Sequence, residues 1–132
     1  MMKGFAFILL IALSQVAYGT SILIPMDDAQ ANHLKAYGVS YLALKNDVSV
    51  DWQLNYRGGS FLIPWSAFVE QECRIRGVSL EKLSAVQVNA ILTRMSSPAV
   101  NMEVVRLDKA PRIAVYSPKS EMISDDTDAV IN

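Results

Sequence analysis

Histidine and cysteine are nearly absent from this chain, which contains one of each, His33 and Cys73. A single cysteine cannot form an internal disulfide. One histidine and one cysteine also cannot supply the nitrogen and sulfur ligands of an ordinary zinc site. Cys73 lies in a helical pattern, which predicts a buried thiol, and no nucleophile lies near His33 for it to activate. We therefore predict no catalytic residue, metal or cofactor in this chain.

An excess of one charge is missing as well, because 12 Lys and Arg residues face 13 Asp and Glu residues, for a formal net charge of −1. Nucleic-acid binding requires a basic cluster, so we expect no nucleic-acid partner. Long apolar runs are also missing. The longest, from Phe5 to Leu13, has nine residues, whereas a membrane-spanning helix needs about 20.

The first 19 residues instead have the three parts of a secretory signal. Lys3 precedes the apolar run, and Ala17 and Gly19 follow it with the spacing of a cleavage site. This predicts a signal peptide over residues 1–19, cleaved after Gly19. The next residue is Thr20 rather than a cysteine, which argues against a lipid anchor. We expect a periplasmic or secreted protein with no membrane partner after cleavage.

The mature chain predicts alternating strands and helices over one domain, residues 20–110. SILIP (21–25) is a short apolar run typical of a buried strand, and VSVDWQLNY (48–56) alternates as a second strand does. Between them, Asp27 and Asp28 are expected to cap a helix that ends near Asn46, although Gly38 could end it earlier. The predicted core stripe of this helix is Leu34, Tyr37, Tyr41 and Leu44. A strand, a helix and a strand in this order predict a βαβ unit with parallel strands.

The second half of the domain continues this pattern. FLIP (61–64) is expected to return as a hairpin partner of the second strand, and GVSL (77–80) and NMEVVRLDKAP (101–111) to form further strands. Ser66 is the expected cap of a helix that Gly77 ends, with four residues facing inward: Phe68, Val69, Cys73 and Ile75. Ser84 and Gln87 form a capping box before a last helix, whose inward stripe is Val88, Ile91, Leu92 and Met95.

The stretch between the two central strands is the best candidate for a binding site. It contains six consecutive residues: Asn55, Tyr56, Arg57, Gly58, Gly59 and Ser60. At the carboxyl end of a parallel strand, such a stretch would border the crevice where open α/β sheets bind ligands. It lacks the lysine and the glycine spacing of a P-loop. Two interpretations remain open: a tight hairpin turn, or a turn that also presents Arg57 and Ser60 to a small anionic ligand.

Residues 111–132 predict the start of a second α/β unit that is truncated and ends in a disordered tail. RIAVYSP (112–118) has the composition of a strand, and the acidic residues after it include few apolar side chains. A strand left at the edge of a sheet is a liability. We therefore expect the edge to be covered by the remainder of a longer chain or by a partner.

The chain resembles the first part of a family of exported Bacteroidetes proteins commonly labelled asparagine synthetase B. The segments that carry the resemblance are ILIPMDDAQANHLKAYGVSYLALKN, VDWQLNYRGGSF, ECRIRGVS, VNAIL and APRIAVYSPKS. Family members continue into a region similar to class I glutamine amidotransferases. Pattern and resemblance together predict an α/β fold of three layers, flavodoxin-like or amidotransferase-like. Its open sheet is mostly parallel and combines βαβ units with a β-hairpin.

The resemblance leaves two hypotheses about function. Asparagine synthetase B enzymes begin with a catalytic cysteine and bind ATP through S-G-G-x-D-S, whereas this chain has Thr20 at the predicted amino terminus and reads R-G-G-S-F-L at residues 57–62. The first hypothesis is therefore a non-catalytic exported module that binds a small anionic ligand or docks onto the rest of its own protein. The alternative is an asparagine-forming, amidotransferase-like enzyme whose catalytic residues lie downstream.

Overall fold

The computed structural model describes residues 20–112 and residue 114. The predicted signal peptide, and the predicted second unit apart from residues 111, 112 and 114, lie outside the described residues. Five strands and three helices follow one another in the order β1 (Ser21–Ile24), α1 (His33–Lys45), β2 (Val50–Leu54), β3 (Ser60–Pro64), α2 (Ala67–Arg76), β4 (Glu81–Leu83), α3 (Ala85–Met95) and β5 (Glu103–Leu107). No helix among these residues is long and apolar enough to span a membrane.

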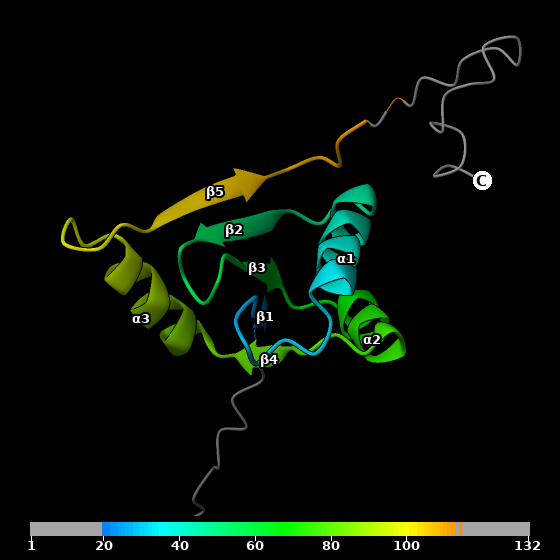
Figure 1. The fold of residues 1–132 in the computed structure, drawn as a ribbon, viewed down its shortest axis with the longest axis horizontal. Coiled ribbons are helices and arrows are strands. Elements are labelled where there is room, and N and C mark those ends of the chain that lie inside the picture. Colours follow the sequence, from blue (N-terminus) through cyan, green and yellow to red (C-terminus); the bar gives the residue numbers. More distant parts are fainter. Residues whose placement is uncertain (1–19, 113, 115–132) are drawn as a thin grey trace, which may run out of the picture.

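The five strands form one antiparallel sheet with the order β4-β1-β3-β2-β5 (Figure 1). Every neighbouring pair in it is antiparallel. The predicted α/β fold with a mostly parallel sheet, flavodoxin-like or amidotransferase-like, is therefore wrong, and the fold is α+β. The strands β1 and β2 run in the same direction, since both are antiparallel to β3, but they are not neighbours.

The insertion of β3 between β1 and β2 explains this difference. A tight turn returns the chain directly from β2, so β3 must pair with β2 in the antiparallel sense, as the hairpin prediction required. Its residues Ser60 to Ile63 are all buried, as befits a central strand with both faces covered. β1 is similarly apolar on both faces and pairs with the free side of β3. The helix between β1 and β2 therefore spans a gap that β3 fills.

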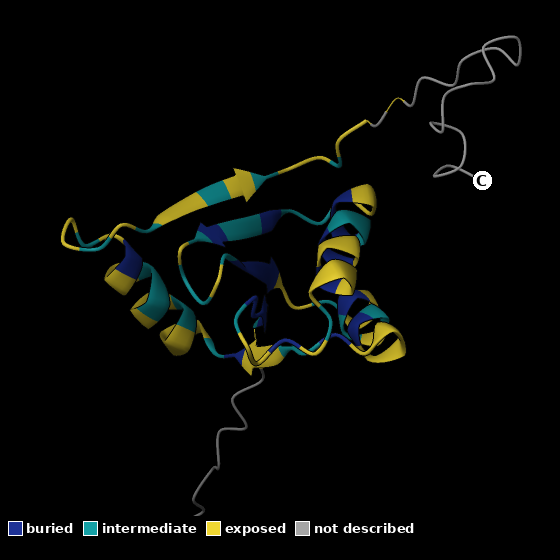
Figure 2. Cartoon of the chain, in the orientation of Figure 1, coloured by how far each residue is buried: buried dark blue, intermediate teal, exposed yellow. Residues whose placement is uncertain are grey.

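Helices cover both faces of the sheet. The larger core cluster lies between the sheet and helices α1 and α2, and it includes Ile22, Val39, Val50, Ile63 and Cys73. The smaller cluster contains Leu23, Leu62 and Leu83, which contact Val88 and Ile91 of α3. Figure 2 shows buried residues concentrated in β1 and β3, and mainly exposed residues along β5.

Helix α1 buries a different face from the one expected. Its cap is Asn32, whose side chain accepts a hydrogen bond from the Lys35 N–H, and not Asp27 or Asp28. The helix continues through Gly38. Of the predicted stripe only Leu44 is buried, whereas Leu34 is 83% exposed and Tyr37 is 51% exposed. The residues that face the core are Ala36, Val39, Ser40, Ala43 and Leu44.

The other two helices follow the predicted boundaries closely. Gly77 ends α2 in the left-handed conformation, and Ser84 and Gln87 form the expected capping box of α3. The inward stripe of α2 was predicted too broadly, since Val69 and Cys73 are buried but Phe68 and Ile75 are exposed. The stripe of α3 is half-buried except at Met95, which is buried. The strand predicted at residues 77–80 lies slightly later, at β4.

At Gly58 the hairpin turn packs closely against the loop after β1, which leaves no room for a side chain. Its φ is +78°, and a Cβ atom there would lie 2.3 Å from the Met26 carbonyl oxygen. Because both the backbone strain and the clash with main-chain atoms must be relieved, we expect Gly58→Ala to lower the free energy of unfolding by at least about 2 kcal/mol in urea denaturation.

Gly38→Ala is the matched control. Gly38 is helical, and a Cβ atom there would meet nothing within 4 Å. In this variant the free energy of unfolding should rise by about 0.5–1 kcal/mol, because alanine is the better helix former. A Gly58→Ala variant as stable as the native protein would show that the turn does not need glycine.

Candidate functional site

The hairpin turn between β2 and β3 is held in a strained conformation by its own hydrogen bonds. Asn55, Arg57, Gly58 and Gly59 all have positive φ angles, between 47° and 91°. The Gly59 and Ser60 N–H groups both donate to the Tyr56 carbonyl oxygen, at 3.0 Å each. The Trp52 indole N–H donates to the Gly59 carbonyl oxygen at 3.0 Å. These contacts make the turn a rigid corner of the sheet.

Arg57 ties this turn to two other segments. Its Nε donates to Oδ2 of Asp27 at 2.8 Å and its Nη2 to Oδ1 of Asp27 at 3.4 Å, so the pair is bidentate. Its Nη1 donates to Oε1 of Glu81 at the start of β4. The Met26 N–H also donates to the Arg57 carbonyl oxygen at 3.0 Å. We call Arg57, Asp27 and Glu81 the corner cluster.

The buried side chain of Gln30 also joins two segments near this corner. Nε2 of Gln30 donates to the Pro25 carbonyl oxygen at 2.8 Å, and Oε1 of Gln30 accepts from the Ser79 N–H at 2.8 Å. Oγ of Ser79 accepts from the Ala31 N–H at 3.0 Å. The loops before α1 and before β4 are therefore joined by direct hydrogen bonds. Lys82, three residues after Ser79, pairs with Glu70 of α2.

The electrostatics of the corner cluster oppose the binding of a further anion. One guanidinium faces two carboxylates, which leaves the cluster with an excess of negative charge. The hydrogen bond from Arg57 holds the pKa of Asp27 below its usual value, and Asp27 and Glu81 raise the pKa of Arg57. An anionic ligand would have to displace one of these carboxylates. Anion binding by residues 55–60 remains a prediction, and these ion pairs count against it.

The six predicted site residues do not converge on one point. Arg57, Gly58 and Gly59 form the corner, but Nδ2 of Asn55 donates to the Asn101 carbonyl oxygen, at 2.8 Å. Tyr56 packs against the smaller core cluster. Ser60 is fully buried, and its hydroxyl donates to Oε1 of Gln53. Nε2 of Gln53 is buried without a hydrogen-bond partner among the described residues.

Sequence analysis missed the partners of Arg57. Asp27 was interpreted as a helix cap, and Gln30 and Glu81 were given no role. The position of Asp27 in the sequence could have identified it, because Asp27 comes soon after the buried strand β1. β1 and β2 run in the same direction, so Asp27 lies at the same end of the sheet as the turn after β2. Glu81 carries no comparable signal, because the position of β4 beside β1 is a tertiary contact.

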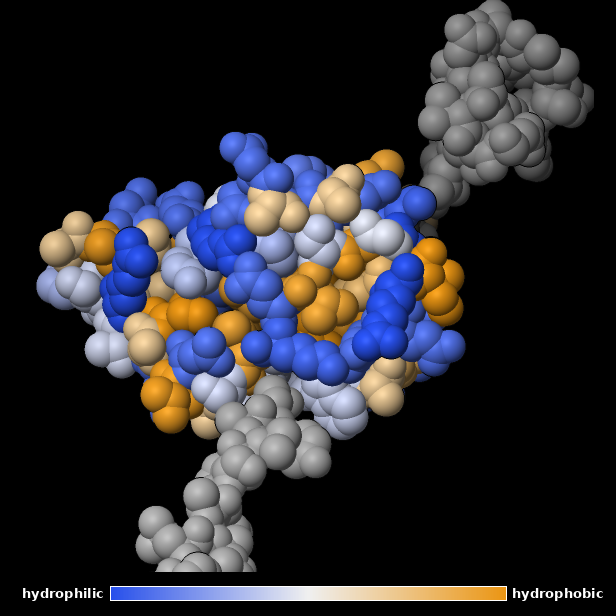
Figure 3. All heavy atoms as spheres, turned by 90° about the horizontal axis from the view of Figure 1, so that it is seen from below, coloured by the Kyte–Doolittle hydropathy of each residue, from blue (hydrophilic) through white to orange (hydrophobic). Residues whose placement is uncertain are grey.

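The two edges of the sheet differ in how they are protected. β4 has only three residues, and its two charged side chains are engaged, Glu81 with Arg57 and Lys82 with Glu70. Figure 3, which views the molecule from the β4 side of Figure 1, shows strongly hydrophilic side chains between separate apolar patches on this face. Short strands and charged side chains are the usual protection of a sheet edge.

β5 forms the other edge and is the longer of the two. It has five residues, and Val104 is 38% exposed. The strand contains two charged residues: Glu103 is exposed, and Arg106 bonds Oγ of Ser49 at 2.7 Å and Oδ1 of Asp51 at 3.4 Å. Arg106 also pairs with Asp108. Figure 1 shows β5 at the top of the sheet, and among the residues that the structure describes no strand pairs with its outer edge.

Other reactive side chains are occupied or shielded. Cys73 is fully buried, as its helical pattern predicted, and burial raises the pKa of its thiol to about 11. Nε2 of His33 lies 3.2 Å from the Asp27 carbonyl oxygen. A shallow hollow of about 280 Å³ on α2 is lined by Ala67, Glu70, Gln71 and Arg74. Within it, the Glu70 carboxylate already accepts from Arg74.

Comparison with known proteins found no match: no family model, curated protein or solved structure matches this chain. The resemblance to exported proteins labelled asparagine synthetase B therefore stays a prediction from sequence.

The corner cluster predicts an acid-dependent loss of stability. Because the pKa of Asp27 is lowered in the folded state, its ion pair stabilises the fold above about pH 4 and is lost as the pH falls further. We expect Asp27→Asn to be less stable than the native chain at pH 7 in urea denaturation, and the difference in the free energy of unfolding to shrink as the pH falls below about 4. Arg57→Ala should lose about 1–2 kcal/mol at pH 7.

The control is Asp28→Asn, a neighbouring acid that makes no side-chain hydrogen bond among the described residues. It should leave the pH profile of stability unchanged. Equal profiles for Asp27→Asn and Asp28→Asn would contradict a structural role of the corner cluster.

Cys73 should be unreactive until the domain unfolds. At pH 8 we expect labelling by a disulfide reagent to be at least about a hundredfold slower in the native chain than in urea, because the thiol is buried and protonated. An exposed cysteine introduced by Ala90→Cys should label rapidly in the same chain. Equal rates at both positions would show that α2 opens freely.

Proposed function

We propose that this chain is an exported, non-catalytic interaction module, which binds another polypeptide by adding a strand to the open edge of β5. The observation that carries the proposal is the difference between the two sheet edges. β4 has three residues, whereas β5 has five, is largely exposed and has no strand on its outer side among the described residues. An added strand would satisfy the outward N–H and C=O groups of β5, as in other cases of strand addition.

The corner cluster supports an architectural role for the rest of the domain. Arg57 and Gln30 join the loops at one end of the sheet, so that β1, β3 and β2 form a rigid frame. β5 pairs with the outer side of β2 along its whole length, from Val50 to Leu54. A rigid frame lowers the entropic cost of ordering the binding edge. The export part of the proposal rests on the signal-like pattern of residues 1–19.

The alternative is an asparagine-forming enzyme whose reacting groups lie beyond Asn132, and it rests on the sequence resemblance alone. Reading the genomic sequence past Asn132 would separate the two. A downstream domain with a nucleophile on a strand-to-helix turn would favour the enzyme.

The proposal predicts a contact specific to β5 in cells. The chain should be produced with its own leader in a Gram-negative host, with a photo-crosslinking residue at Val104. We expect a mature protein that begins at Thr20 in the periplasm or medium. We also expect a cross-linked adduct whose second peptide, identified by mass spectrometry, comes from an extended segment.

A photo-crosslinking residue at Lys82 on the β4 edge is the control, and it should give no such adduct. The proposal fails if both positions give the same products, or if neither does. Retention of the chain in the cytoplasm would contradict export without bearing on the edge of β5.

A further inference from the structure

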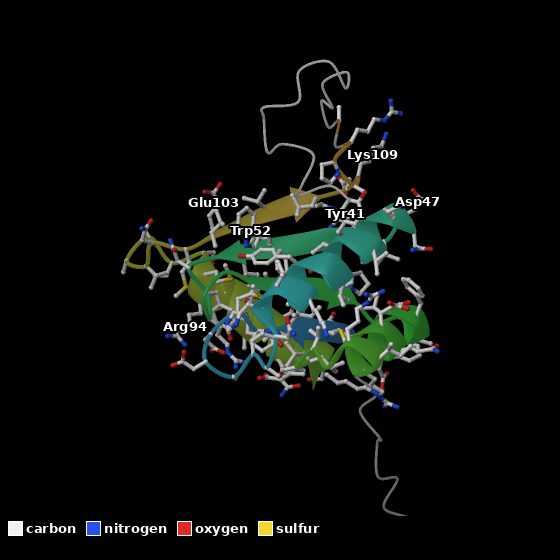
Figure 4. The ribbon with its side chains drawn as sticks, turned by 45° about the vertical axis from the view of Figure 1, so that its right-hand side comes forward. Tyr41, Asp47, Trp52, Arg94, Glu103 and Lys109 are labelled. Atoms are coloured by element: carbon white, nitrogen blue, oxygen red, sulfur yellow. The ribbon has the colours of Figure 1, made fainter. Side chains whose placement is uncertain are left out.

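The edge of β5 has opposite charges at its two ends. Glu103 begins the strand and Lys109 lies two residues past its end. Figure 4 labels both residues, at opposite ends of β5 on the upper side of the molecule. Both are exposed, and neither takes part in an ion pair among the residues that the structure describes. Between them lie three apolar residues, Val104, Val105 and Leu107, and two charged ones, Arg106 and Asp108, which pair with each other.

We propose that the strand added to β5 is β5 of a second copy of this chain, paired in the antiparallel sense about a two-fold axis. An antiparallel pair brings the start of each strand to the end of the other. Glu103 of each copy then approaches Lys109 of the other, and the two sheets join into one. This inference rests on the proposed function, because it names the partner that the open edge accepts.

An antiparallel two-fold pair brings Glu103 near Lys109 of the second copy in more than one register, and Arg106 decides between the registers. In a two-fold pair centred on Val105, the two Val105 side chains face each other and Glu103 lies opposite Leu107 of the second copy. Lys109 of the second copy is then the diagonal neighbour of Glu103, within reach of a long side chain. Val104 lies opposite Arg106 of the second copy, whose apolar stem can cover it.

A register centred on Arg106 would place Glu103 directly opposite Lys109, but it would also place the two Arg106 side chains directly opposite each other, and this like-charge contact makes it unfavourable. In the register centred on Val105, each Arg106 keeps its own acceptors, Ser49, Asp51 and Asp108. The pairing therefore adds contacts at the outer edge without breaking an existing ion pair.

The size of the edge sets the expected affinity. β5 has five residues, so the strand pair buries much less than the roughly 1,600 Å² of a standard interface. We expect a reversible dimer with a dissociation constant between about 10 µM and about 1 mM. Sedimentation equilibrium of the mature chain, residues 20–132, up to about 2 mM should therefore show a monomer–dimer equilibrium. The amides of β5 should become protected from hydrogen exchange as the concentration rises.

Exchanging the two charges tests the pairing itself. Glu103→Lys places two lysines together at both symmetric sites, and Lys109→Glu places two glutamates together. Each single variant should raise the dimer dissociation constant about tenfold. The double variant Glu103→Lys/Lys109→Glu restores opposite charges and should return the constant to within about threefold of the native value.

Asp28→Lys is the matched control, since it makes the same change in net charge as Glu103→Lys on the exposed loop after β1. It should alter the constant by no more than about twofold. A dimer that responds equally to all single variants, or not to any, overturns pairing through β5. A chain that stays monomeric at about 2 mM overturns the second copy as partner. If Val104 still cross-links to a different polypeptide in that case, the proposed function stands.

Discussion

Arg57 connects three segments that are distant in the sequence: the loop after β1, the turn after β2 and the start of β4. Without Arg57, the carboxylates of Asp27 and Glu81 would lie at this corner with no guanidinium to pair with. The ion pairs work together with a close contact between backbones, because the Gly58 Cα lies against the Met26 carbonyl group. A side chain at position 58 would force these segments apart. The guanidinium and the glycine therefore depend on each other.

This corner also fixes the order of the sheet. β3 starts at the end of the turn, and the Met26 N–H bonds the Arg57 carbonyl oxygen just beyond the end of β1. The turn is thereby held next to β1, so that β3 enters the sheet between β1 and β2. The buried bonds of Gln30 then bring the loop before β4 to the same place. Local contacts at one corner thus determine the arrangement of four of the five strands.

Much of the local structure could be predicted from the sequence, because its signals act within a few residues. The capping box of Ser84 and Gln87, the Gly77 stop and the hairpin across Gly58 and Gly59 are all present. The strand directions could not be predicted in this way. A strand, a helix and a strand give the same sequence pattern whether the two strands are neighbours or are separated by a third, and the pairing of β3 with both β1 and β2 is a tertiary contact that this pattern does not contain. The candidate site could not be predicted for the same reason, because the ion-pair partners of Arg57, Asp27 and Glu81, lie 30 and 24 residues away in the sequence.

Helix α1 shows a second limit, which concerns side-chain size. Its largest apolar residues were expected to face the core, but the buried face consists mainly of the small residues Ala36, Ser40 and Ala43. Small residues allow a helix to lie close to the sheet and to α2, and the larger Tyr37 then packs at the margin, with its ring against the edge of Phe61. The hydrophobic periodicity of α1 predicts two apolar faces. Which of them is buried depends on the space between the helix and the sheet.

The insertion of β3 also accounts for the asymmetry of the two edges. With β1 and β3 in the middle, the outer side of β2 needs a further strand, and β5 supplies it over five residue pairs. β4 closes the other side over only three. The longer partner that β2 requires is therefore also the longer free edge of the sheet. A strand cannot shield both sides of itself, so a sheet of this order must leave β5 open, protect it with charge, or pair it with another strand. Arg106 is engaged by Ser49 and Asp51 on the β2 side, whereas Glu103 has no ion-pair partner among the described residues, and a paired strand is the outcome that could satisfy this charge.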